Sequence, residues 1–66
     1  MKVMVNKKLL VLDNKITLEN LLIEISVSTK YMAIEVNEMI IPKSQYENYR
    51  LKDGDVVEVI NAVGGG

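Results

Sequence analysis

The shortness of the chain is the feature that most constrains its fold. With 66 residues and no cysteine, the chain is expected to form one domain with a thin hydrophobic core, and disulfides cannot reinforce that core. The core must come from aliphatic side chains, since 48% of the residues are hydrophobic while Phe and Trp are absent. Abundant valine and isoleucine favour a core built on a β-sheet.

The charge balance excludes several classes of function. Eight basic and nine acidic residues give a net charge of −1, so no basic surplus exists to neutralise nucleic-acid phosphates. The adjacent pair Lys7-Lys8 is interpreted as part of a solvated turn. No apolar stretch approaches the ~20 residues that span a bilayer, and the start of the chain lacks the apolar region of a secretory signal. We expect a cytoplasmic protein that binds neither nucleic acid nor membrane.

Groups suited to catalysis or metal binding are scarce. The chain has no cysteine and no histidine, which removes thiol catalysis, most zinc sites and general base catalysis by imidazole. Asp53 and Asp55 flank Gly54 and are interpreted as solvated turn residues rather than a catalytic or metal-binding pair. Tyr46 and Tyr49 are interpreted as packing residues. We expect no metal, no bound cofactor and no enzymatic activity of the chain itself.

The first half of the chain predicts a hairpin followed by a helix. Two short apolar runs, separated by the polar residues Asn6-Lys7-Lys8, predict a β-hairpin over residues 1–12. Thr17 is expected to cap a helix, because its hydroxyl can accept from the free N–H groups of the first turn. Four residues at helical spacing form one apolar face: Leu18, Leu21, Leu22 and Ile25. The helix should end near residues 26–29, which are poor helix formers.

The second half of the chain predicts three strands. Residues 32–36 alternate as a half-buried strand does, and residues 39–41 form a short strand that Pro42 confines to a sheet edge. The polar segment 43–50 is expected to be a loop with one helical turn, and residues 56–60 form the last strand. The order β-β-α-β-β-turn-β indicates an α+β fold, with one helix packed across a mixed sheet of four to five strands.

Alternation with period two divides the expected strands between two faces. Seven residues are expected to face the helix: Val3, Val5, Met32, Ile34, Val36, Val57 and Val59. Five are expected to face outward: Met4, Ala33, Glu35, Glu58 and Ile60. Because Met4 and Ile60 should lie beside each other, Met4, Glu58 and Ile60 form a candidate partner-contact patch near the end of the last strand. Single exposed apolar residues are also normal on any surface, and both interpretations stay open.

The glycine-rich end, Val63-Gly64-Gly65-Gly66, is the most informative motif. We divide the chain into a globular domain, 1–61, and a flexible functional tail, 62–66, which reaches roughly 17 Å when extended. A terminal carboxylate is ionised and a poor electrophile, so it must be activated before a nucleophile can attack it. Glycine lacks a Cβ and can enter a narrow channel. A frayed end is the usual interpretation of such a motif, but its place directly after the last strand of the expected fold favours a reactive terminus at Gly66.

The chain resembles the ThiS family of sulfur carriers, which have the ubiquitin-like β-grasp fold. The resemblance rests on Asn37 followed by an apolar pair and Pro42, on Tyr46, on Asp53-Gly54-Asp55 and on the ending VGGG. It covers the whole chain without a large insertion. The resemblance implies that the first and last strands lie side by side at the centre of the sheet.

The resemblance also implies a chemistry and its partners. An E1-like adenylyltransferase would use ATP and Mg to adenylate Gly66, and a persulfide derived from a cysteine desulfurase would replace AMP. The resulting thiocarboxylate would donate sulfur to thiazole synthase in thiamine biosynthesis. Val63, Gly64 and Gly65 would thread the partner's active site. Three alternatives stay open: a carrier for molybdopterin or another sulfur pathway, a modifier conjugated to lysines, and a non-covalent β-grasp binding module of the TGS type.

Overall fold

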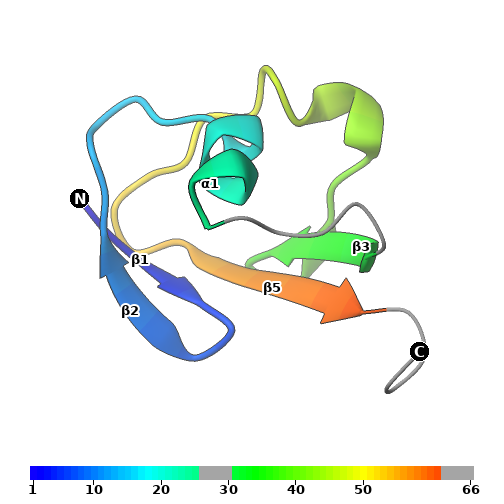
Figure 1. Ribbon diagram of the computed structural model, residues 1–66, viewed down its shortest axis with the longest axis horizontal. Coiled ribbons are helices and arrows are strands. Elements are labelled where there is room, and N and C mark those ends of the chain that lie inside the picture. The colour runs from blue at the N-terminus through cyan, green and yellow to red at the C-terminus, as the bar shows by residue number, and fades with distance from the viewer. Residues whose placement is uncertain (26–30, 62–66) are drawn as a thin grey trace.

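The computed structural model describes residues 1–25 and 31–61, drawn in colour in Figure 1. Residues 26–29, near which the helix was expected to end, lie outside these ranges, and so does the glycine-rich tail, 62–66. The elements are, in chain order, β1 (Lys2–Val5), β2 (Lys8–Val11), α1 (Leu18–Glu24), β3 (Tyr31–Val36), β4 (Met39–Ile40), the 3₁₀ helix η1 (Lys43–Gln45) and β5 (Val56–Asn61). This order agrees with the expected one, including the single helical turn before the last strand.

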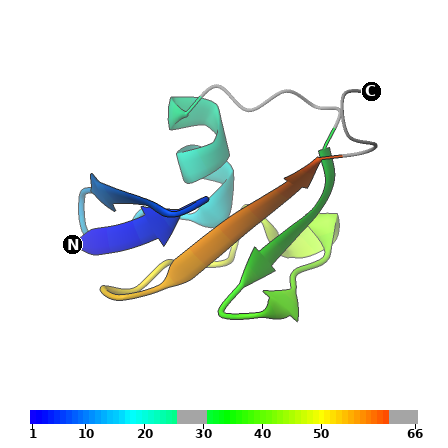
Figure 2. The ribbon, with the colours of Figure 1, turned by 90° about the horizontal axis from the view of Figure 1, so that it is seen from below.

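The five strands form one mixed sheet in the order β2-β1-β5-β3-β4. β1 and β5 pair in parallel, whereas the other neighbours are antiparallel. β5 is therefore the central strand, with β1 at its side, as the resemblance implied. α1 lies over one face of the sheet (Figure 2), and we call the opposite face the outer face. The expected mixed sheet with one packed helix is confirmed.

A two-residue turn joins β1 to β2. Asn6 (φ 47°) and Lys7 (φ 69°) both lie in the left-handed region, which the favoured two-residue hairpin turn requires and which asparagine tolerates well. This turn sets the register, in which Val5 pairs with Lys8 and Met4 pairs with Leu9. The expected hairpin is confirmed, except that Lys8 belongs to β2 rather than to the turn.

α1 begins at the expected cap. Thr17 Oγ1 accepts from the Asn20 N–H at 3.1 Å and donates to Asn20 Oδ1 at 2.8 Å. The N–H groups of Leu18 and Glu19 donate to backbone carbonyls of the long connection that precedes β5. A helix cannot satisfy its first N–H groups internally. The long connection is therefore held to the start of α1 by the bonds that these groups form.

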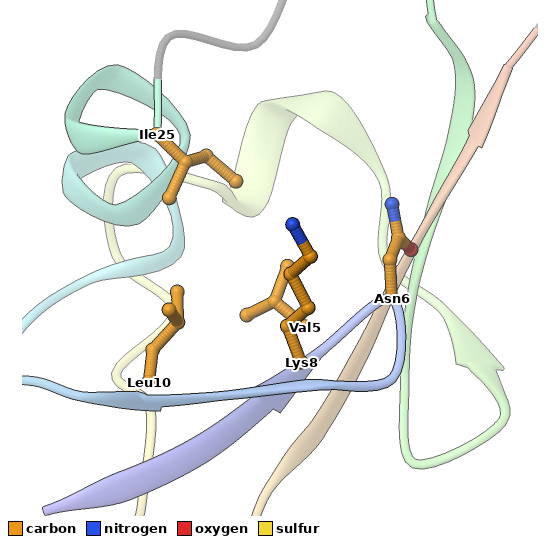
Figure 3. Close-up of a pocket in the computed structure, with 5 residues that line it drawn as sticks. All are labelled: Val5, Asn6, Lys8, Leu10 and Ile25. Carbon is orange, nitrogen blue, oxygen red and sulfur yellow. The ribbon is translucent and has the colours of Figure 1, made fainter.

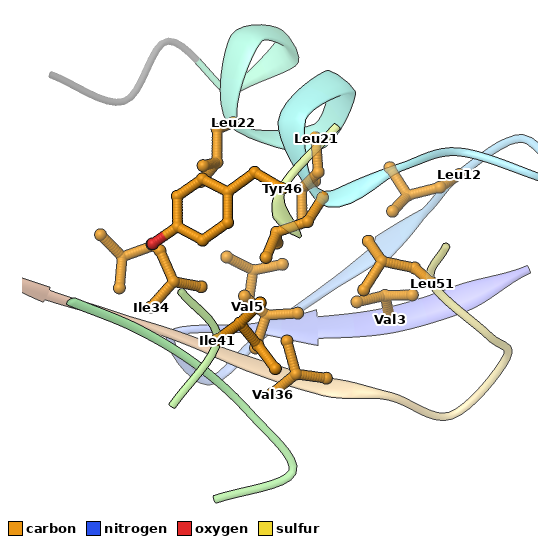
Figure 4. Packing of buried hydrophobic residues seen from close by; sticks show 13 residues of the cluster. Val3, Val5, Leu12, Leu21, Leu22, Ile34, Val36, Ile41, Tyr46 and Leu51 are labelled. Carbon is orange, nitrogen blue, oxygen red and sulfur yellow. The ribbon is translucent and has the colours of Figure 1, made fainter. Parts of the chain in front are cut away.

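The core lies between α1 and the helix-facing side of the sheet (Figure 4). Leu18 and Leu21 are fully buried, which confirms the apolar face of the helix. Tyr46 is buried and Tyr49 packs against the core, as expected. The side chain of Met32 lies outside the described part of the chain. The other six residues expected to face the helix are all buried: Val3, Val5, Ile34, Val36, Val57 and Val59.

Asp55 differs from the sequence-based expectation of a solvated turn residue. Only 5% of its surface is exposed. Its carboxylate accepts from the side-chain amide of Asn37 at 3.0 Å and from the Lys52 N–H at 2.8 Å. Asn37 Oδ1 in turn accepts from the Val56 N–H at 2.9 Å. These bonds offset the cost of burying a carboxylate, and they join the β3–β4 turn to the start of β5.

Replacing Asp55 with alanine is expected to lower the free energy of unfolding by about 2 kcal/mol, because two donors lose their acceptor. Asp53→Ala is the matched control. Asp53 is exposed and accepts from the Lys2 N–H at 2.7 Å, so its loss should cost less than about 1 kcal/mol. Urea unfolding of both variants measures the difference. Equal losses would contradict the structural role assigned to Asp55.

Candidate functional site

The predicted reactive segment follows the central strand. β5 pairs with β1 up to Val57 and with β3 up to Asn61. The strand that precedes the tail is therefore fixed by two neighbours at its start and by β3 to its end. Four predicted site residues lie outside the described ranges and stay predictions: Val63, Gly64, Gly65 and Gly66.

The strand register separates the members of the predicted contact patch. Met4 pairs with Val56, whereas Ile60 lies four residues further along β5 and pairs with Ala33. At the usual rise per residue, Val56 and Ile60 are about 13 Å apart along the strand. The expectation that Met4 and Ile60 lie side by side is therefore wrong. The physical reason is that β1 ends at Val5 and pairs with only the first half of β5.

An apolar patch does exist on the outer face, but it is centred on other residues. Leu9 pairs with Met4, and Met4 pairs with Val56, so three neighbouring strands contribute one row of apolar side chains. Leu9 is 57% exposed, Val56 is 48% exposed, and Val11 on the same face of β2 is 77% exposed. We call Leu9, Val11, Met4 and Val56 the outer-face patch. Apolar side chains gathered on an exposed face are typical of protein contact surfaces.

Sequence reasoning missed three members of the outer-face patch: Leu9, Val11 and Val56. The length of the first turn decides which residues of β1 and β2 lie opposite each other. From the sequence alone, this turn was expected to include Lys8. With a two-residue turn at Asn6 and Lys7, the pairing of Leu9 with Met4 follows directly. The polar residue Asn6 before Lys7 was the available signal, because asparagine favours two-residue hairpin turns.

Glu58, the remaining member of the predicted patch, is exposed and pairs with Glu35 of β3. Both side chains were expected on the outer face, and carboxylates directly opposite each other in an antiparallel pair repel. Along β5, Glu58 lies between Val56 of the outer-face patch and Ile60. The outer face thus combines an apolar row with a pair of carboxylates, and a cationic side chain of a partner would reduce the repulsion.

A groove opens on the helix-facing side of the hairpin, close to the C-terminal end of α1 (Figure 3). Its volume is about 290 Å³, and the described residues that line it are three aliphatic and two polar ones: Val5, Leu10, Ile25, Asn6 and Lys8. Lys8, expected from the sequence in a solvated turn, is exposed but lines this groove. The lining comes from β1, β2, the turn between them and the end of α1, so no sequence motif indicates it.

The described residues contain no candidate metal centre. Within residues 1–25 and 31–61, no three His, Cys, Asp or Glu side chains are grouped so that they could hold a metal ion. Asp55 is engaged by backbone and side-chain donors, so it does not form an open pair with Asp53. In the same ranges, no helix has the length and apolar character needed to cross a bilayer.

The arrangement of the sheet and helix defines the class of fold. A mixed sheet crossed by one helix, with β1 and β5 parallel at its centre, is the ubiquitin-like β-grasp fold. The crystal structure of a thiamine biosynthesis protein (ThiS) from Geobacter metallireducens matches with a TM-score of 0.84 and 29% identity, and each chain is fully covered. A solution structure of a thiamine biosynthesis protein from the same organism matches with a TM-score of 0.77 and 29% identity, covering 100% of this chain and 88% of that one.

Sequence comparison identifies the family. The ThiS family model matches residues 2–66. The chain is 38% identical over 50 residues to the sulfur carrier protein ThiS of Bacillus subtilis, covering 76% of each protein. It is also 36% identical over 66 residues to a thiazole synthase from Paramagnetospirillum magneticum, covering 100% of this chain but only 20% of that protein's length. The chain belongs to the ThiS family.

Proposed function

We propose that the chain is a sulfur carrier of thiamine biosynthesis that acts through Gly66. The observation that carries this proposal is the family match, which runs from residue 2 through the glycine-rich segment to residue 66. The name of the Bacillus subtilis relative, sulfur carrier protein ThiS, supports the same role. A carrier needs no catalytic side chain of its own, and the lack of His and Cys agrees with this.

The proposed chemistry takes place on partner enzymes. The carboxylate of Gly66 attacks the α-phosphate of ATP on an E1-like adenylyltransferase, with Mg balancing the phosphate charge, and pyrophosphate leaves. The terminal sulfur of a persulfide, supplied through a cysteine desulfurase, then attacks the acyl carbon, and AMP leaves. A second thiol of the donor attacks the sulfur–sulfur bond of the resulting acyl disulfide. The donor becomes a disulfide, and Gly66 keeps a thiocarboxylate.

Thiazole synthase is the proposed sulfur acceptor. In the Paramagnetospirillum magneticum relative, one polypeptide named thiazole synthase contains a region that matches all 66 residues of this chain. A carrier-like region within a thiazole synthase polypeptide supports transfer of sulfur from carrier to synthase, because linked partners meet at a high effective concentration. The sulfur of a thiocarboxylate is a better nucleophile than a carboxylate oxygen, which suits delivery to the enzyme that builds the thiazole.

The outer-face patch is the proposed docking surface for the adenylyltransferase. Leu9→Glu is expected to slow adenylation of Gly66 about tenfold at low enzyme concentration, because the contact would bury a charge among apolar groups. Ile23→Glu is the control, since Ile23 is 70% exposed on α1 and should change the rate less than about twofold. Release of pyrophosphate measures both rates. Equal slowing by the two variants would remove the patch from the interface.

The intact mass of the chain tests the proposed function. The chain is incubated with ATP, Mg, a cysteine desulfurase system and the host's adenylyltransferase. The expected result is a mass increase that matches replacement of one oxygen by sulfur, located at Gly66 and absent without ATP. Subsequent addition of thiazole synthase should restore the original mass, whereas consumption by molybdopterin synthase instead would reassign the pathway. An unchanged mass with active enzymes would contradict the carrier function.

A further inference from the structure

β5 extends beyond the end of β1. Their parallel pairing stops at Val5 and Val57, after which the chain turns away at Asn6. β5 nevertheless continues to Asn61, where its partner is β3. Within residues 1–25 and 31–61, the edge of β5 that faces away from β3 therefore has no strand beside it from Val59 onward.

One side chain marks the place where a longer β1 would have continued. The Asn6 N–H donates to the Val57 carbonyl at 3.0 Å, and Asn6 Oδ1 accepts from the Val59 N–H at 2.8 Å. The side-chain oxygen thus takes the role of a backbone carbonyl. Because backbone groups alternate between the two edges of a strand, the next groups on this edge are the Val59 carbonyl and the Asn61 N–H. An acceptor and a donor so placed form a template for a further strand.

The groove of Figure 3 adjoins this edge, because Asn6, which accepts from the Val59 N–H, also lines the groove. Its volume of about 290 Å³ accommodates an aliphatic side chain between Val5, Leu10 and Ile25. Among the lining residues that the structure describes, Lys8 is the one ionisable residue, and none of them is acidic. The groove therefore suits a segment that carries an apolar residue close to a carboxylate.

We propose that an extended, acidic segment of thiazole synthase adds as a strand to this edge of β5, with one aliphatic side chain in the groove and a carboxylate near Lys8. The proposal rests on the proposed function, since thiazole synthase is the partner that the sequence comparisons associate with this chain. In strand addition, main-chain bonds supply affinity and side-chain pockets supply specificity. Because β5 leads directly into the tail, an added strand would direct Gly66 along the partner's surface.

Hydrogen exchange of the Asn61 backbone N–H tests strand addition directly. When the full chain is mixed with the host's thiazole synthase, exchange of this N–H is expected to slow at least about tenfold. Lys8→Glu is expected to weaken binding about tenfold, because a carboxylate would then face a carboxylate. Lys7→Glu is the matched control: it makes the same change of charge one residue away, outside the groove lining, and should weaken binding less than about threefold.

The outcomes separate this inference from the proposed function. Binding without slower exchange at Asn61, or equal weakening by Lys7→Glu and Lys8→Glu, would overturn strand addition while leaving sulfur acceptance by Gly66 intact. Absence of any binding to thiazole synthase would overturn strand addition and the proposed acceptor together. Gain of sulfur at Gly66, measured separately by intact mass, decides the carrier function by itself.

Discussion

Removal of Gly66 is expected to abolish sulfur acceptance while leaving the domain folded. The carboxylate of the shortened chain would lie about 3.5 Å closer to the domain along an extended tail. Reacting atoms must come within about 3–3.5 Å of each other, so this displacement would keep the carboxylate from its reaction partner. The core of the described residues ends at Val59, so the midpoint of thermal unfolding should move by less than about 2 °C. Intact mass after incubation with ATP and the sulfur-donating enzymes measures the loss.

Gly66→Ala is the companion variant to this deletion. It keeps the length of the chain and adds only a Cβ, so it tests the need for glycine separately from the need for length. Its rate of sulfur acceptance should fall at least about tenfold, since the added carbon hinders passage through a narrow channel. A deletion variant that still acquires sulfur, or a strain carrying it that grows without added thiamine, would contradict a role for Gly66. The TGS-type alternative would then be favoured.

Leu21→Ala is expected to lower the free energy of unfolding by about 3 kcal/mol. Leu21 has 0% of its surface exposed and extends from α1 into the core (Figure 4). A domain of this size is stabilised by only about 3–5 kcal/mol, so this single change should unfold a large fraction of the molecules. Urea unfolding followed by circular dichroism measures the shift of the midpoint.

Ile23→Ala provides the comparison within the same helix. Ile23 is 70% exposed, so its truncation should change the free energy of unfolding by less than about 0.5 kcal/mol. The two variants remove aliphatic side chains of similar size from positions two residues apart. A Leu21→Ala variant as stable as the Ile23→Ala variant would show that this face of α1 does not build the core.

The helix and the inner face of the sheet were predictable because local rules decide them. Thr17 caps α1 through its own hydroxyl, and the apolar spacing from Leu18 onward selects the buried stripe. Alternation along each strand then places residues such as Ile34 and Val57 in the core. These features depend on a few adjacent residues, so the sequence contains the information directly.

Register and long-range pairing could not be predicted in the same way. The burial of Asp55 depends on Asn37, which is distant in sequence and meets it only because β3 and β5 are neighbours. The separation of Met4 from Ile60 depends on where β1 ends relative to β5. A shift of one or two residues in either pairing changes which side chains meet, and no local pattern specifies it.

The candidate site likewise has one part that the sequence predicted and two parts that it did not. The prediction for Gly66 rests on its place after a strand and on the family resemblance, neither of which requires coordinates. The outer-face patch and the groove are different, because each combines side chains from separate elements. Leu9 and Val56 both pair with Met4, and Leu10 and Ile25 line the same groove from β2 and from the end of α1. Only the assembled fold brings these residues together.

The parallel pairing of β1 with β5 has a mechanical consequence. An enzyme that drew the tail into its active site, as proposed above, would pull along the axis of β5. The hydrogen bonds between β5 and its neighbours run across that axis, so the pulling force is shared among them as shear. A hairpin pulled at its open end would instead lose its bonds one at a time. The central strand could therefore withstand a force applied through the tail without being peeled from the sheet.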